Sequence, residues 1–255
     1  MEISMVALNL VSKDSLVDLM NPTIEIRSFT TLEDQARARY IFDQTWPMDA
    51  GTEITSNLLQ AMVHSGAYLS GAFINGGCVG AALAFPAMSD GIHLHSHMAA
   101  VLIPYRDKGV GFALKRDQWK WAKAHGYPEI TWTFDPLVSR NARLNLIKLG
   151  VDIKSYHCNF YGSMTDELNS GDESDRLMVS WRTDVSEAKS RDPIITIEPG
   201  STLIPIPADI VEIRSKDPVL SMEWRRKVRN QFLEAFQGGQ RVIGFTNKNE
   251  YVLHV

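Results

Sequence analysis

The sequence predicts a mixed α/β fold, because stretches with the periodicity of strands and stretches with the periodicity of helices alternate along most of the chain. A glycine pair, Gly76-Gly77, separates two apolar runs that together are typical of a β-hairpin. Farther on, an expected strand leads through a glycine-containing loop directly into a long expected helix. These features predict a sheet with a meander at its centre and a crossover helix after it, followed by a smaller C-terminal α/β unit.

The first half of the chain is expected to supply one strand, two helices and three more strands. Thr31 is placed to cap the first helix, since a threonine side chain accepts a hydrogen bond from the first turn. The expected strands span 24–29, 68–74, 79–88 and 91–102, and the second helix spans 56–64.

The second half is expected to begin with a helix over 109–125, which Gly126 and Pro128 end. A strand over 130–134, a helix over 139–149 and a strand-rich stretch over 151–181 follow. A polar segment over 184–192 is typical of a linker, and a last unit contains a helix that Asp217 and Pro218 begin and a hairpin over 241–253. We therefore divide the chain into an N-terminal extension (1–21), a catalytic domain (22–184) and a C-terminal extension packed on the core (185–255).

Composition narrows the class of protein. With 255 residues, 44% of them hydrophobic and 22% charged, the chain can bury a sizeable core. A net charge of -4 removes the broad attraction that nucleic acids or anionic membranes require. Two cysteines, Cys78 and Cys158, suit a reducing compartment, and we find neither a signal-peptide pattern nor an apolar run long enough to span a membrane. We expect a cytoplasmic protein that binds no nucleic acid and no membrane.

A strand end, a loop and a helix start meet between Val101 and Gly111. The first N–H groups of a helix and the positive end of its dipole attract anions, and glycine lets a phosphate approach the backbone. Arg106 and Lys108 add positive charge. By spacing alone, a tight turn explains Gly109 and Gly111 as well as a phosphate site does.

This stretch resembles the coenzyme A motif of the GNAT (GCN5-related N-acetyltransferase) superfamily, Arg/Gln-x-x-Gly-x-Gly/Ala, with its Val-(x)4-Arg lead-in at 101–106. The resemblance covers about 24–181 and includes Ala142 and the stretch 148–150. It implies a mostly antiparallel central sheet flanked by helices, with acetyl-CoA or another acyl-CoA as co-substrate and no metal. It also implies coenzyme contacts from ten residues: Val101, Ile103, Arg106, Lys108, Gly109, Val110, Gly111, Phe112, Ser139 and Asn141.

The sequence departs from the family pattern at two places. Leu146 stands where many members have a tyrosine that acts as general acid, and the proline of the lead-in sits one residue late, at Pro104. Short matches around Asn141, Tyr161 and Asp175 also resemble an uncharacterised prokaryotic branch of the superfamily. The departure at Leu146 puts the usual general acid in doubt.

The family often carries its general base about six residues before the valine of the motif, and His95 occupies that position. His93 and His97 alternate with it, so a regular strand would turn all three imidazoles to one side. An imidazole accepts a proton near neutral pH, and we expect His95 to be the base and the other two to lie in the acceptor pocket. Two alternatives remain: strand histidines with ordinary hydrogen-bond partners, or a pair that shares a metal ion with a third ligand.

Other residues have weaker indications. Tyr156 and Tyr161 are candidates for the general acid, although tyrosines on strands often only pack. Asp135, at the end of a strand, is expected to line the acceptor pocket, whereas Ser139 also suits a helix cap. In the last long helix, the spacing predicts that Arg225 lies on the solvated side.

The sequence therefore predicts an acyltransferase that moves an acyl group from acyl-CoA to an amine of a small metabolite or peptide. One alternative is a catalytically silent module that binds acyl-CoA, which Leu146 favours. Another is an enzyme of the same fold that acts on a hydroxyl, or on the acyl-CoA itself by hydrolysis or decarboxylation. A homodimer is an assembly that the sequence leaves open.

Overall fold

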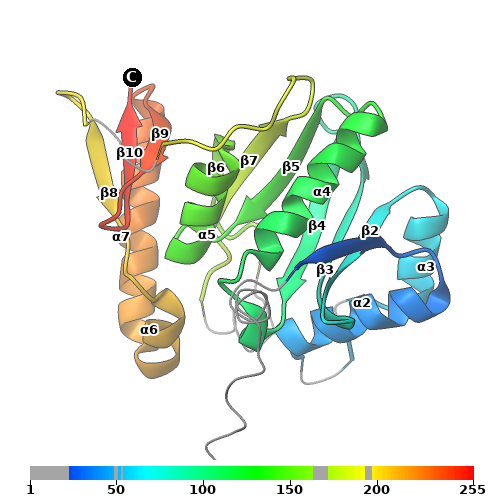
Figure 1. Cartoon of the computed structure of the whole chain (residues 1–255). Coiled ribbons are helices and arrows are strands. Elements are labelled where there is room, and N and C mark those ends of the chain that lie inside the picture. Colours follow the sequence, from blue (N-terminus) through cyan, green and yellow to red (C-terminus); the bar gives the residue numbers. More distant parts are fainter. Residues whose placement is uncertain (1–22, 49–50, 53, 163–171, 193–196) are drawn as a thin grey trace, which may run out of the picture.

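The central sheet of the protein has seven strands in the order β1-β2-β3-β4-β5-β7-β6. A computed structural model describes residues 23–48, 51–52, 54–162, 172–192 and 197–255, so the expected extension at 1–21 lies outside the described residues. Neighbouring strands pair antiparallel, apart from β4 and β5, which pair parallel. The predicted mixed α/β fold with a largely antiparallel sheet is confirmed (Figure 1).

The elements of the main domain follow the predicted order. Thr31 caps the first helix as expected, accepting a hydrogen bond from the backbone of Asp34. The strands are β1 (Glu25–Ser28), β2 (Tyr68–Ile74), β3 (Gly77–Ala87), β4 (His93–Val101), β5 (Glu129–Phe134), β6 (Asp152–His157) and β7 (Arg176–Arg182). The helices are α2 (Leu32–Thr45), α3 (Ser56–His64), the short 3₁₀ turn η1 (Ile103–Tyr105), α4 (Val110–Ala124) and α5 (Ser139–Arg143), which continues as a wider π-helical turn, η2 (Leu144–Leu149).

The helices cover the two faces of the sheet and divide the core between them. Phe42 of α2 and Leu59 of α3 pack with Met98 of β4 on one face. Leu114 of α4 and Leu146 of η2 belong to the core of the other face. Each strand therefore alternates between two apolar layers, and polar side chains at the centre of the sheet need a local reason to be there.

The C-terminal unit packs against the main domain beside α5 and β6 (Figure 1). It contains β8 (Thr202–Pro205), α6 (Ile210–Lys216), α7 (Pro218–Gln237), β9 (Arg241–Phe245) and β10 (Glu250–His254), with a three-stranded sheet in the order β8-β10-β9. Phe232 of α7 stacks on the ring of Tyr156 of β6, with 5.3 Å between centroids, and Tyr251 donates to the carbonyl of Pro136 at 2.7 Å. Apolar residues of both units form one continuous core, which supports the predicted packing of this extension.

A buried ionic cluster joins α7 to the end of β5. Arg225, only 2% exposed, donates to the two carboxylate oxygens of Asp135 at 2.6 and 2.9 Å and also bonds Asp172. Arg214 of α6 contacts the same two aspartates at 3.1 Å. The prediction that Arg225 is solvated was wrong, because these carboxylates lie beside the apolar stripe of α7 and supply the partners that a buried guanidinium needs.

Among the residues that the structure describes, no helix is long and apolar enough to cross a membrane.

Candidate active site

Strands β4 and β5 separate soon after they meet. Their ladder consists of two pairs, Leu94 with Ile130 and His95 with Thr131, although β4 runs on to Val101 and β5 to Phe134. Over the same stretch β4 stays paired with β3 on its other side. The two strands therefore form a wedge, closed at His95 and open toward the loop after Val101.

A β-bulge lies in β4 next to the closed end of this wedge. Leu83 pairs with Met98 and Ala84 with Ser96, so His97 has no residue directly opposite it. Ser96 faces α4, while Met98 belongs to the core under α2. A bulge can change which face successive side chains take, and this one interrupts the strictly regular strand expected for the three histidines between Ser96 and Met98.

The imidazole of His95 lies at the closed end of the wedge. Its Nδ1 is 3.2 Å from Oγ1 of Thr131, the residue that pairs with it on β5. Burial, followed by the nearby charges of His97, His93 and Lys115, lowers the pKa of His95 to about 4. His95 is therefore a neutral imidazole at neutral pH, and the bond from Nδ1 leaves Nε2 to face an incoming group.

The other two histidines have different surroundings. His93 is buried and its Nδ1 lies 2.9 Å from the carbonyl of Gly91. The ring of His97 reaches solvent, and its centroid lies 6.4 Å from that of His95 and 5.6 Å from that of Phe85. Loss of part of its hydration lowers the pKa of His97 as well. Two imidazoles and a phenyl ring thus line one face beside the wedge, whereas His93 is held inward.

The open end of the wedge faces the start of α4. Gly109 takes a left-handed conformation with φ of 84°, which favours glycine, and no side chain caps the helix. The first helical N–H that bonds within the helix is that of Ala113, which donates to Gly109. Helix geometry leaves the N–H groups of Val110, Gly111 and Phe112 without acceptors inside the helix. This is the arrangement that binds anions.

The surroundings of Gly111 leave room for such an anion. A Cβ added at this residue would meet only the side chain of Val101, at the ordinary distance of 3.9 Å, so the fold itself does not demand a glycine there. Arg106 donates to the carbonyl of Val101 at 3.2 Å, and its pKa is lowered by burial and then by the charge of Arg140. Two guanidinium groups therefore stand near the start of α4, and the site fits a pyrophosphate.

The remaining residues expected to contact the coenzyme have mixed positions. Lys108 is exposed and its ammonium lies 5.4 Å from the ring of Tyr105, and the side chain of Ile103 is 70% exposed. Because Leu102 donates its N–H to Val79 of β3, strand alternation aims the N–H of Val101 into the wedge. Ser139 instead donates to the carbonyl of Ala208 in the C-terminal unit, and Asn141 is half-buried in α5.

The two candidate general acids lie in different places. The hydroxyl of Tyr161 is 3.1 Å from Oγ1 of Thr133, two residues after Thr131 and on the same face of β5. Tyr156 points the other way and donates to Asp175 at 2.6 Å. Burial and this aspartate raise the pKa of Tyr156 far above its ordinary value, so the geometry favours Tyr161 near the wedge and gives Tyr156 a structural contact with the C-terminal unit.

Asp135 also has a structural position. Its carboxylate accepts hydrogen bonds from Arg225, Arg214 and the backbone N–H of Leu137. The neighbouring arginines hold its pKa well below the ordinary value in spite of burial. Since both oxygens are occupied, this geometry gives no support to the prediction that Asp135 lines an acceptor pocket.

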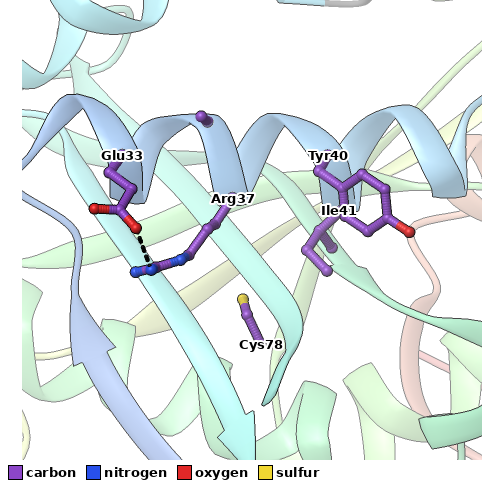
Figure 2. Close-up of a pocket in the computed structure, with 6 residues that line it drawn as sticks. Glu33, Arg37, Tyr40, Ile41 and Cys78 are labelled. Atoms are coloured by element: carbon purple, nitrogen blue, oxygen red, sulfur yellow. Dashed lines mark hydrogen bonds and ion pairs between the residues drawn. The ribbon is translucent and has the colours of Figure 1, made fainter. Parts of the chain in front are cut away.

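A depression of about 300 Å³ lies away from the wedge, between α2 and the start of β3 (Figure 2). Arg37 projects into it from α2 toward Cys78 and is paired with Glu33 at 2.6 Å and Asp34 at 3.1 Å. Burial raises the pKa of the Cys78 thiol, which makes it a weak nucleophile. The described residues that line this depression therefore include neither a neutral imidazole nor a free helix start like those of the wedge.

Sequence reasoning missed two residues near the wedge, Thr131 and Lys115. Thr131 follows from the pairing register of β4 with β5, which a single sequence does not show. Lys115 lies on α4 one turn after Gly111, on the helix face that packs against the sheet. A lysine on the expected apolar face of a helix is a pattern that the sequence alone could have revealed.

The comparisons with known proteins agree with this geometry. Residues 29–150 match the family model described as "Acetyltransferase (GNAT) family", whereas no curated protein matches the chain. Among solved structures, the ribosomal-protein-S18-alanine N-acetyltransferase from Escherichia coli matches with a TM-score of 0.51 and 14% identity, over 65% of this chain and 97% of that one. A putative GNAT-family acetyltransferase from Desulfovibrio desulfuricans matches with a TM-score of 0.49 and 15% identity, over 63% of this chain and 99% of that one. The family model and the fold together support acyl transfer from acetyl-CoA, and residues 29–150 are similar to the acetyltransferases of the GNAT family.

Proposed function

We propose that this protein transfers an acetyl or related acyl group from acyl-CoA to an amine of a small metabolite or peptide, with His95 as the general base. The observation that carries the proposal is the neutral imidazole at the closed end of the wedge, with a phosphate-binding helix start at the open end. A cytoplasmic location and the absence of nucleic-acid and membrane partners stay predictions.

The geometry suggests a route for the coenzyme. Its pyrophosphate would bind the N–H groups of Val110 to Phe112, with Arg106 and Arg140 balancing the charge. Its pantetheine arm would take the place of a strand beside β4, where the N–H of Val101 faces the wedge. Between Val101 and Ser96 the strand spans roughly 17 Å at about 3.3 Å per residue, which brings the thioester to the level of His95.

The chemistry then needs a nucleophile that loses a proton as it attacks. The acceptor nitrogen forms a bond to the thioester carbonyl carbon, and Nε2 of His95 takes the proton that the nitrogen releases. The carbon–sulfur bond then breaks, and its electron pair leaves with the sulfur of coenzyme A. Thr131 holds Nδ1 and so fixes the ring orientation. Phe85 and His97 would form the wall against which the body of the acceptor rests, at 5.4 and 6.4 Å from the ring of His95.

A silent acyl-CoA-binding module is the second candidate, because Leu146 is buried in the core where a tyrosine acid is expected. The two candidates differ in turnover, because a silent module would bind acyl-CoA without releasing coenzyme A. Transfer to a hydroxyl, hydrolysis or decarboxylation would give different product masses, so mass spectrometry distinguishes these from amine acylation.

The test is to incubate the protein with acetyl-CoA and a panel of amines and peptides, and to measure thiol release together with product mass. For any acceptor that is used, His95→Ala should lower kcat by about 100-fold to 10,000-fold and change the KM for acetyl-CoA much less. His97→Ala is the matched control on the same strand and should cost less.

The pH dependence sharpens this test. Because the pKa of His95 is about 4, the rate expressed per neutral acceptor should stay level as pH falls from about 7 to about 5 and should decrease below that. If His95→Ala kept the parental rate, or kept the decrease in rate at acidic pH, His95 would not be the general base.

A further inference from the structure

Lys115 is a buried lysine in the middle of α4. It is 6% exposed, and its ammonium donates to Oγ of Ser96 at 2.6 Å and to Oε1 of Gln118 at 3.3 Å. The same nitrogen lies 3.7 Å from the centre of the Trp132 ring. Lysine is almost never buried without a reason, because desolvation of its charge is costly.

The position of this ammonium relative to the wedge is specific. The last strand pair joins His95 to Thr131, and Ser96 and Trp132 are the residues that immediately follow on each strand. The nitrogen of Lys115 contacts both of them. It therefore spans the closed end of the wedge from the α4 side, at the level where the thioester of a bound acyl-CoA would arrive.

The surroundings make Lys115 able to give up its proton. The indole of Trp132 offers a π face that favours the cation, but the hydrogen-bond partners of Lys115, Ser96 and Gln118, are neutral and supply no negative charge to hold the proton. Burial lowers the pKa of Lys115 to about 7.

Other titratable groups near it either oppose its charge or are engaged elsewhere. From β4, His95 feels the charge of Lys115, and the two groups disfavour each other's protonation. On α4 itself, Asp117 accepts from the hydroxyl of Tyr68 on β2, and Arg116 donates to the carbonyl of Ala188. Lys115 is thus an acid whose proton is easily lost near neutral pH.

The reaction has a use for such an acid. The usual tyrosine position is filled by the buried Leu146, and Tyr156 is bonded to Asp175. Tyr161 is nearer to the wedge, but its hydroxyl is engaged with Oγ1 of Thr133. Building on the proposed function, we propose that Lys115 is the general acid that protonates the departing thiolate of coenzyme A. When the carbon–sulfur bond breaks, its electron pair goes to sulfur, the ammonium donates one proton to form the thiol, and the neutral amine regains a proton from water. The proton lost by the acceptor goes to His95, so the two transfers balance.

The experiment compares Lys115→Met and Lys115→Gln with the exposed Lys120→Met on the same helix. We expect kcat to fall by about 100-fold or more in both Lys115 variants, with the KM for acetyl-CoA changed much less, and to stay at the parental value in Lys120→Met. Lys115→Gln keeps a hydrogen bond donor for Ser96 yet has no proton to give, so it separates acid catalysis from packing. The rate of the parent enzyme should fall as pH rises past about 7, and this alkaline limb should be absent from both variants.

Thermal unfolding is measured in parallel. A methionine fits the apolar site without a desolvated charge, so Lys115→Met should unfold at the parental temperature or above it. If both variants lost activity only together with stability, the assignment of Lys115 would be overturned while the proposed function stands. A parental rate and a parental alkaline limb in Lys115→Gln would have the same consequence. A parent protein that binds acetyl-CoA in a calorimetric titration but releases no thiol with any amine would overturn the proposed function and this assignment with it.

Discussion

His95 and Lys115 lie close together, and both have a lowered pKa. Burial and neighbouring positive charge lower the pKa of His95 to about 4, and burial alone lowers the pKa of Lys115 to about 7. His95 is half-buried on β4, whereas Lys115 is buried on the side of the sheet that α4 covers. On the proposed mechanism, His95 would accept the proton of the amine and Lys115 would supply the proton of the thiol, so the two proton transfers of acyl transfer would fall to two different groups.

The depressed pKa of His95 predicts how stability depends on pH. Above about pH 6.5 the imidazole is neutral in both the folded and the unfolded chain, so it contributes no pH dependence. Below that the unfolded chain binds a proton, while the folded protein does so only near pH 4. The contribution of His95 to the free energy of unfolding should therefore decrease as pH falls from about 6.5 to about 4.

Urea unfolding over this pH range checks the expectation. His95→Gln should show a shallower loss of stability on acidification than the parent, whereas His64→Gln, at the exposed end of α3, serves as the control. Parallel curves for His95→Gln and the parent would show that His95 is not desolvated in the folded protein.

The residues that sequence reasoning misplaced share a physical cause. Arg225 has the spacing of a surface residue on α7, yet it is buried because carboxylates from β5 and from the segment before β7 meet it there. A bulge at His97 also interrupts the regular strand that the sequence predicted. Ion pairs and bulges depend on partners that are distant in sequence, so local periodicity does not reveal them.

At the scale of single elements, the start of α4 is the part that the sequence predicted best. Its glycines, its charge and the preceding strand are all local in sequence, and the structure supplies the free N–H groups and the space beside Gly111. The parallel contact of β4 with β5 agrees with the crossover helix that the order of elements predicted between them, whereas β8 and α6 had too little periodicity to be foreseen.

The start of α4 carries its own prediction. In Gly111→Gln the backbone can remain helical, since the added Cβ meets only Val101 at 3.9 Å, but the side chain would occupy the place where phosphates approach. We expect the affinity for coenzyme A, measured by calorimetric titration, to fall by at least about tenfold.

Gly77→Gln is the matched control, because Gly77 is exposed at the start of β3 and its added Cβ would meet only a carbonyl oxygen at 3.5 Å. Equal affinity for coenzyme A in folded Gly111→Gln and in the parent would mean that the pyrophosphate binds elsewhere.

At the scale of the whole molecule, the C-terminal unit is held to the main domain by both apolar and ionic contacts. Arg143 of α5 donates to Asn247 and Asn249 at 3.1 Å, and Arg229 of α7 pairs with Asp175 at 2.6 Å. Asp135 lies directly after β5, one arm of the wedge. The unit is therefore attached to the strand that carries Thr131 and Thr133.

The buried cluster predicts a large difference between two adjacent arginines. Arg225→Met leaves Asp135 and Asp172 with less compensation, and removing one partner of a buried ion pair typically costs about 3–5 kcal/mol of unfolding free energy. The exposed neighbour variant Arg226→Met should change stability by no more than about 0.5 kcal/mol. Urea unfolding of both variants measures the difference, and equal stabilities would show that the cluster contributes nothing to holding the unit in place.

The wedge between β4 and β5 also has a thermodynamic consequence. On the proposal that the pantetheine arm lies in this gap like a strand, a bound acyl-CoA molecule would complete the sheet between β4 and β5. A ligand that binds only the folded protein adds about 2.7 kcal/mol to its stability when its free concentration is 100 times the Kd. The folded fraction of this protein would then increase with the concentration of its own acyl donor. Its resistance to proteolysis would therefore be highest when acyl-CoA is abundant.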